Sequence, residues 1–164
     1  NCSIEQIMGL SETDDKIKTV HPAPIKTIKI IGEVQAGNWR DAYQWPEDDW
    51  QDTNAVAPSH QKQFGLIVRG RSMDKIFPDG TILICTSIDE FGREPKLGEY
   101  VIVQQHRAGL TEATVKEYQL DDEGIALWPR STDPRYQTPL RLHDADRPEI
   151  IGVVLYSQFK VIKD

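Results

Sequence analysis

Several features that would place this chain in a common class are scarce in its sequence. The 164 residues contain only two cysteines, Cys2 and Cys85, and Cys85 lies within an apolar, strand-like run. We therefore expect Cys85 to be a buried free thiol of a cytoplasmic protein, because disulfides are rare in that compartment. No apolar run approaches the ~18 residues that a membrane span needs, and no stretch has a signal-peptide pattern, so we expect no membrane contact.

Excess positive charge and metal-ligand patterns are also missing. Lys and Arg number 19 against 26 Asp and Glu, which gives a net charge of −7. This balance argues against a nucleic-acid-binding surface within these residues. The four histidines show no metal-ligand spacing with one another or with the cysteines, so we assign no metal and no other cofactor. No glycine-rich phosphate loop or βαβ pattern occurs, which argues against the common nucleotide-binding folds.

The length suits one domain with a sizeable core and a tail. Residues 1–24 are predicted to be a linker, because polar residues dominate and the segment 21–24 (HPAP) interrupts both helix and sheet. The chain begins with Asn1 rather than Met, so we expect it to be a fragment or a processed product of a longer protein. Residues 25–164 make up the expected folded domain.

Short apolar runs separated by Gly and Pro dominate that domain. They fall at residues 25–34, 66–68, 81–85, 99–103, 111–118, 125–128 and 150–156. Strands of this length and spacing, without long helical periodicity, predict a mainly β, antiparallel domain.

An unusual segment interrupts the pattern between the first two runs. Residues 39–52 carry three tryptophans and five acidic residues against the single Arg40. The favoured interpretation is a solvated loop whose tryptophans cover the edge of the core. The alternative is an interaction patch, since tryptophan is enriched at binding hot spots.

The stretch 64–80 (FGLIVRGRSMDKIFPDG) organises the rest of the chain. Its apolar run stops at Gly70, which places Ser72 just past a strand end, where its hydroxyl can be exposed to a substrate carbonyl. None of the histidines stands in a recognisable triad with this serine. Lys116 is another possible base, because strand alternation puts it on the same face as Thr114 and Tyr118.

An inward lysine loses solvation, which lowers its pKa from about 10.4 and leaves a neutral amine able to take a proton from a serine hydroxyl. Serine–lysine pairs are a known variant of the catalytic triad. From the residues alone, a surface lysine on an edge strand stays an open alternative for Lys116.

Four segments together resemble the catalytic domain of the LexA-type family. They are 68–73 (VRGRSM), 78–80 (PDG), 98–103 (GEYVIV) and 113–118 (ATVKEY), and the resemblance covers about residues 28–160. The family includes LexA, many phage repressors and UmuD, all of them self-cleaving serine–lysine peptidases. The tryptophan-rich insert is closest to phage-type repressors. The resemblance implies a compact β domain similar to that of LexA and signal peptidase.

Matching the family's motifs implies roles for particular residues. The serine of the Gly-x-Ser-Met motif is the nucleophile, which corresponds to Ser72 with Gly70 and Met73 as supporting residues. The lysine of the T-V-K strand is the general base, which corresponds to Lys116 with Thr114 and Val115 beside it.

The resemblance also implies the bond that is cut. The family cleaves itself at an Ala-Gly bond ahead of the serine, and residues 32–37 (GEVQAG) match that segment. The predicted scissile bond is therefore Ala36–Gly37. Small residues suit a loop that enters a narrow cleft, and Gly37 tolerates a sharp turn.

The implied protein is the C-terminal self-cleavage and dimerisation domain of a transcriptional repressor. An upstream domain absent from this chain would bind operator DNA, a homodimer would hold two such heads, and a RecA filament would induce cleavage after DNA damage. We expect residues 150–156 and 159–162 to contribute to the dimer contact. The alternatives are a UmuD-like polymerase accessory protein, a signal-peptidase-like enzyme acting in trans, and a purely structural β domain.

Overall fold

The structure is a computed structural model that describes residues 26–38, 40, 44–55 and 61–161. These residues form one sheet of eight strands, with a single 3-10 turn and a single short α-helix among them. The strands are β1 (Thr27–Val34), β2 (Gln51–Asn54), β3 (Phe64–Val68), β4 (Ile82–Ser87), β5 (Tyr100–Arg107), β6 (Leu110–Asp121), β7 (Gly124–Trp128) and β8 (Glu149–Gln158). The helical elements are η1 (Glu47–Asp49) and α2 (Ile88–Phe91), and neither has the length to cross a bilayer.

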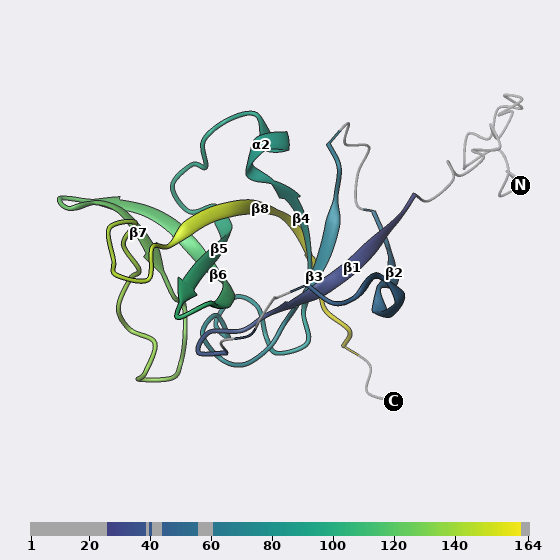
Figure 1. Ribbon diagram of the computed structural model, residues 1–164, viewed down its shortest axis with the longest axis horizontal. Coiled ribbons are helices and arrows are strands. Elements are labelled where there is room, and N and C mark those ends of the chain that lie inside the picture. Colours follow the sequence, from purple (N-terminus) through teal and green to yellow (C-terminus); the bar gives the residue numbers. More distant parts are fainter. Residues whose placement is uncertain (1–25, 39, 41–43, 56–60, 162–164) are drawn as a thin grey trace, which may run out of the picture.

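The strands are arranged in the order β2-β1-β3-β4-β8-β5-β6-β7 (Figure 1). Every pair of neighbours is antiparallel except β1 and β3, which run parallel with Val34 opposite Val68. The predicted mainly antiparallel β class is therefore confirmed. The parallel pair was not predicted, and it has a consequence for the site: the chain leaves β1 and β3 at the same end of the sheet.

The sheet curls, so that strands far apart in its order come together. The ladders shift register at Ile30/Gly32, Ile84/Cys85 and Ile102/Val103, and irregularities of this kind increase local twist. Just beyond β1, the backbone N–H of Gln35 donates to the carbonyl of Ala113 in β6 at 2.9 Å. This contact carries the chain that follows β1 across to β6.

Two clusters of apolar side chains fill the curl. The larger one gathers residues from the first half of the sheet and from β5 and β6, including Val34, Leu66, Val68, Met73 and Leu83. The smaller one lies between β5, β6, β7 and β8. Because β6 contributes to both, residues on both of its faces are buried.

The structure bears on two further predictions. Cys85 is a fully buried free thiol, and burial raises its pKa well above the usual range. Within the tryptophan-rich segment, Trp45 and Trp50 are half-buried and the Trp50 Nε1–H donates to the Trp45 carbonyl at 3.0 Å, while the acidic residues of η1 are exposed. The exposed acidic residues agree with a solvated segment, but residues 51 and 52 at its end belong to β2 and pair with β1 rather than lying in a loop. Trp39 and the predicted linker 1–24 lie outside the described residues.

Candidate active site

The predicted nucleophile, Ser72, lies in the loop between β3 and β4. The base of this loop is closed by paired backbone bonds, Val68 N to Thr81 O and Gly80 N to Val68 O, both at 2.8 Å. Gly70 turns the chain with a φ of +81°, a conformation that a side chain would disfavour, and its N–H donates to Asp79 Oδ1. Ser72 therefore occupies a rigid turn.

Ser72 is more enclosed than its position after a strand suggests. It is 6% exposed, and the adjacent Met73 is completely buried in the larger core cluster. The cover comes from the chain after β7, where the Arg130 N–H donates to the Ser72 carbonyl at 3.1 Å. The position after a strand suggested a hydroxyl that can be exposed to a substrate carbonyl, whereas Ser72 is buried with this segment in place.

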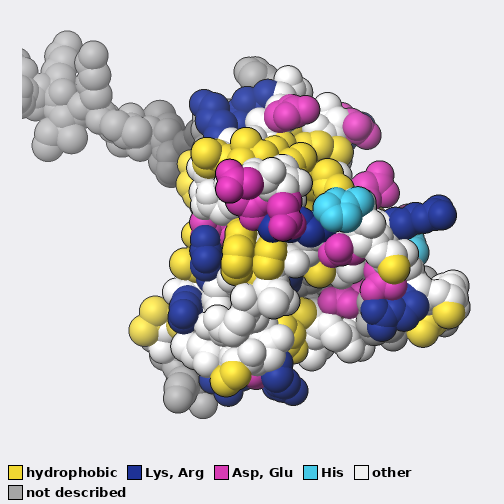
Figure 2. All heavy atoms as spheres, turned by 90° about the vertical axis from the view of Figure 1, so that its left-hand side faces the viewer, with side chains coloured by type: hydrophobic (Ala, Val, Ile, Leu, Met, Phe, Trp, Pro, Cys, Tyr) yellow, Lys and Arg dark blue, Asp and Glu magenta, His cyan; other side chains and the backbone are white. Residues whose placement is uncertain are grey.

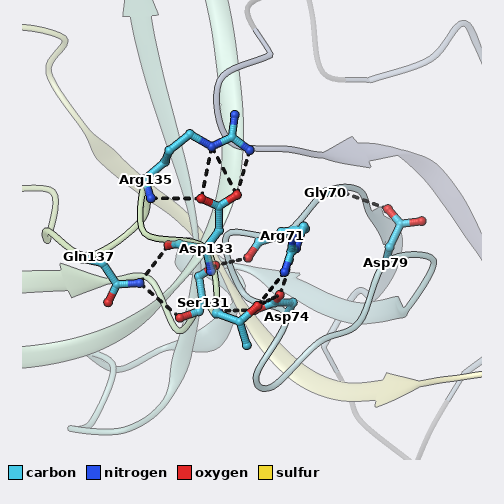
Figure 3. Close-up of polar contacts among 9 residues, drawn as sticks. Gly70, Arg71, Asp74, Asp79, Ser131, Asp133, Arg135 and Gln137 are labelled. Carbon is cyan, nitrogen blue, oxygen red and sulfur yellow. Dashed lines mark hydrogen bonds and ion pairs between the residues drawn. The ribbon is translucent and has the colours of Figure 1, made fainter.

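Polar contacts fasten the nucleophile loop to that covering segment (Figure 3). The Ser131 hydroxyl donates to the Arg71 carbonyl, and the Arg71 guanidinium donates to Thr132 Oγ1 at 2.8 Å. Asp74 Oδ1 accepts from the Thr132 N–H at 2.7 Å, and the Thr132 bonds lower the pKa of Asp74. These contacts hold the residues on both sides of Ser72.

The covering segment is itself ordered by Asp133. Its carboxylate accepts from the backbone N–H and from the guanidinium of Arg135, bonds that lower its pKa to about 2 (Figure 3). Gln137 Nε2 donates to the carbonyls of Ser131 and Asp133. Sequence reasoning missed this arrangement, because nothing local marks two loops nearly sixty positions apart as neighbours.

The predicted base, Lys116, points inward from the middle of β6. It is 4% exposed, and Thr114 and Tyr118 on the same face are buried as well. Because β6 lies between β5 and β7, the alternative of a surface lysine on an edge strand is wrong. Burial lowers the pKa of Lys116 to about 8, against an opposing effect of the Glu112 carboxylate.

Two acceptors hold the Lys116 amine in place. Its Nζ donates to Thr114 Oγ1 at 2.8 Å and to the Val115 carbonyl at 3.2 Å. A neutral amine has two N–H groups and one lone pair, so these bonds use both donors and leave the lone pair available as a proton acceptor. The hydrogen bonds among the described residues do not include a direct one from Lys116 Nζ to Ser72 Oγ.

Arg130 links the serine loop to the lysine strand. Its backbone N–H holds the Ser72 carbonyl, and its guanidinium makes bonds of 2.7 and 2.9 Å with the carboxylate of Glu117. Glu117 is the residue next to Lys116 in β6. One residue therefore contacts Ser72 on one side and the neighbour of Lys116 on the other, and no motif in the sequence points to it.

The predicted scissile segment is docked between these two halves. On one side the Arg69 N–H donates to the Val34 carbonyl at 2.9 Å, and a Cβ placed on Gly70 would lie 3.6 Å from Gln35 Cγ. On the other side the Gly37 N–H donates to Glu112 Oε1 at 2.8 Å. Gly37 has a φ of +77°, the conformation that favours glycine at this turn.

Ala36, Gly37, Glu112 and Lys116 line one cavity of about 260 Å³. The predicted scissile bond and the predicted base thus share a space beside β6, and Ser72 is not among the residues that line it. The rest of the lining includes Arg107 and Arg135, which are paired with Asp146 and Asp133. Charges of both signs are interspersed over the face drawn in Figure 2 as well. Within the described part of the chain, no group of three His, Cys, Asp or Glu side chains is placed to hold a metal.

The fold and the site define a compact β domain that holds one of its own loops against a buried lysine. The family described as Peptidase S24-like matches residues 29–155, and the chain belongs to this family. Membership confirms the resemblance to LexA-type proteins and supports a self-cleaving serine peptidase activity in general.

A curated relative comes from Coxiella burnetii and is named an uncharacterized HTH-type transcriptional regulator. It is 26% identical over an alignment of 149 positions, and the match covers 82% of this chain and 65% of the relative. The chain therefore spans just under two thirds of that protein's length.

Proposed function

We propose that this chain is the C-terminal self-cleavage and dimerisation domain of a transcriptional repressor. Ser72 attacks the Ala36–Gly37 bond, and Lys116 serves as its general base. The observation that carries the proposal is the shared cavity: the Ala-Gly segment docks on β6 beside a lysine that burial makes a competent base.

The reaction has two stages. Lys116 Nζ takes the proton of Ser72 Oγ while the oxygen bonds to the Ala36 carbonyl carbon. The Ala36–Gly37 bond then breaks as Lys116 passes that proton to the Gly37 nitrogen, which leaves an ester between Ser72 and Ala36. Water cleaves the ester, and the products are an Ala36 carboxylate, a Gly37 amine and a free serine hydroxyl.

The biological setting follows from the relative and from the family. A regulator named for a helix-turn-helix, longer than this chain, supports an upstream domain that binds operator DNA. Cleavage in the cytoplasm, induced by a RecA filament after DNA damage, would break the covalent link between the paired heads and the domain that joins them, so that the heads can be released. Losing bivalent binding costs about 10² or more in apparent affinity.

Self-cleavage is tested by incubating the chain at alkaline pH and resolving the products on a denaturing gel. We expect a fragment that begins at Gly37, as determined by N-terminal sequencing. Ser72→Ala removes the nucleophilic oxygen and should abolish the fragment, whereas Ser157→Ala, at an exposed position of β8, should cut like the parent. Equal cleavage by Ser72→Ala would rule out the proposed nucleophile.

Dimerisation is supported by apolar side chains at the end of β8 and just beyond it. Tyr156, Phe159 and Val161 are 47%, 53% and 83% exposed, more than large apolar residues of a monomer usually are in one short segment. We expect a dimer in sedimentation runs at micromolar concentration, and a shift toward monomer in Phe159→Asp. A parent chain that is wholly monomeric there would contradict the proposal.

A further inference from the structure

β1 is an interior strand of the sheet. In the chain it precedes the scissile bond, whereas both of its neighbours in the sheet follow that bond. It pairs with β2 along one edge and with β3 along the other (Figure 1). Both neighbours follow Ala36–Gly37 in the chain, while all of β1 precedes it. Hydrolysis of that bond therefore separates β1 covalently from the two strands that hold it.

We propose that the two cleavage products remain associated through β1, and that withdrawal of β1 rather than hydrolysis determines when the upstream part is released. The inference rests on the proposed cleavage site. We call the space between β2 and β3 the slot. Its occupant is residues 26–36 of the upstream product.

The slot is shaped for the side chains of β1. Ile28, Ile30 and Val34 are 8%, 3% and 1% exposed, so one face of the strand is removed from water. Gly65 of β3 lies opposite Ile30, and a Cβ on Gly65 would come within 2.8 Å of Ile30 Cγ1. The missing side chain of Gly65 makes room for Ile30.

Backbone hydrogen bonds also cross the cut. Beyond the two strand ladders, the Lys26 carbonyl accepts from the Ala55 N–H at 2.7 Å, and the Val34 carbonyl accepts from the Arg69 N–H at 2.9 Å. The Gln35 N–H donates to the Ala113 carbonyl. Every partner belongs to the downstream product. An added strand held by main-chain bonds and side-chain pockets is a common mode of peptide binding.

Ion pairs cross the cut as well. Glu33 of β1 bonds the Arg69 guanidinium at 2.8 Å and the Arg40 guanidinium at 3.5 Å. Glu33 is mostly shielded, with a side chain 17% exposed. Both arginines lie downstream of Gly37 and stay with the larger product.

The new chain ends face charges of opposite sign. Hydrolysis creates a carboxylate at Ala36, which shares its cavity with Lys116. It also creates an amine at Gly37, whose nitrogen already lies 2.8 Å from the Glu112 carboxylate, and a terminal amine is protonated below a pH of about 8. Neither new charge is left without a counterion at neutral pH, so cleavage does not in itself expel the strand.

The test compares denaturing and native separations of the same cleaved sample. The full chain is cut at alkaline pH, returned to pH 7 and passed over a size-exclusion column, and each fraction is run on a denaturing gel. We expect both fragments in one native peak. An excess of synthetic peptide 26–36 should then exchange with the bound fragment over time. Elution of the upstream fragment on its own as soon as it is cut would overturn the proposal.

Failure of the proposed function has a different readout, namely an uncut band on the denaturing gel. In that case the strand is tested in the Ser72→Ala chain, with a recognition site for a specific protease inserted between residues 42 and 43. This cut also leaves β1 on one product and β2 and β3 on the other. Co-elution after this cut would support retention of β1, and separation would refute it.

A matched pair of variants tests the slot itself. Ile30→Ala removes a buried side chain far from the scissile bond and should speed release of the fragment by about tenfold or more. Thr27→Ala, at an exposed position of the same strand, should release within about twofold of the parent rate. Equal release by both variants would show that the slot does not hold the strand. The parent result stands even if Ile30→Ala folds poorly.

Discussion

The rate of self-cleavage should depend on pH through a single group, Lys116. Burial lowers its pKa to about 8. With the loop docked, Lys116 is therefore neutral in roughly one molecule in eleven at pH 7 and in nearly every molecule at pH 10. The rate should therefore rise about tenfold between these values and then level off. Any undocked population has a more solvated lysine with a higher pKa, which moves the midpoint upward from 8.

The assay is a single-turnover time course on the purified chain. Samples are stopped in detergent, and the fragment that begins at Gly37 is quantified at pH values from 6 to 10.5. The first-order rate should be independent of chain concentration if the loop is cut by its own domain. Lys116→Arg should be inactive throughout, because a guanidinium keeps its proton in this range. A flat profile for the parent, or measurable cleavage by Lys116→Arg, would refute the assignment of the base.

Two further predictions concern the same cavity. Glu112→Gln keeps an oxygen for the Gly37 N–H but removes the charge that raises the pKa of Lys116. The midpoint of the pH–rate profile should therefore fall and the rate at pH 7 should rise, with the plateau unchanged. A midpoint that stays in place would contradict this. In the folded parent the pKa of Lys116 is below its unfolded value, so the buried ammonium costs the fold about 3 kcal/mol below pH 8, and this cost disappears as pH rises toward 10.5. Lys116→Met should therefore be more stable than the parent at pH 7, by up to about that amount, with the difference shrinking by pH 10.5; denaturant melts at both pH values measure it.

Much of the fold could be read from local pattern. Apolar runs of three to ten residues broken by Gly and Pro mark strands, because alternation and turn chemistry are properties of neighbouring residues. The predicted runs correspond to seven of the eight strands, while β2 was missed because it overlaps the end of the segment expected to be a loop. The parallel pairing of β1 with β3 had no such signal, since it joins strands separated by a long loop and by β2.

The sequence by itself determined the mainly β class, the residues that share one face of β6, and the candidate residues Ser72, Lys116 and Ala36–Gly37. Alternation tells which residues share a face with Lys116, but not whether that face is covered. The tertiary structure decided the rest: the depth of burial that lowers the pKa of Lys116, the docking of Gly37 on Glu112, and the Arg130 bridge to Ser72. Each depends on how far the sheet curls, and that curl is set by the packing of side chains from every strand at once.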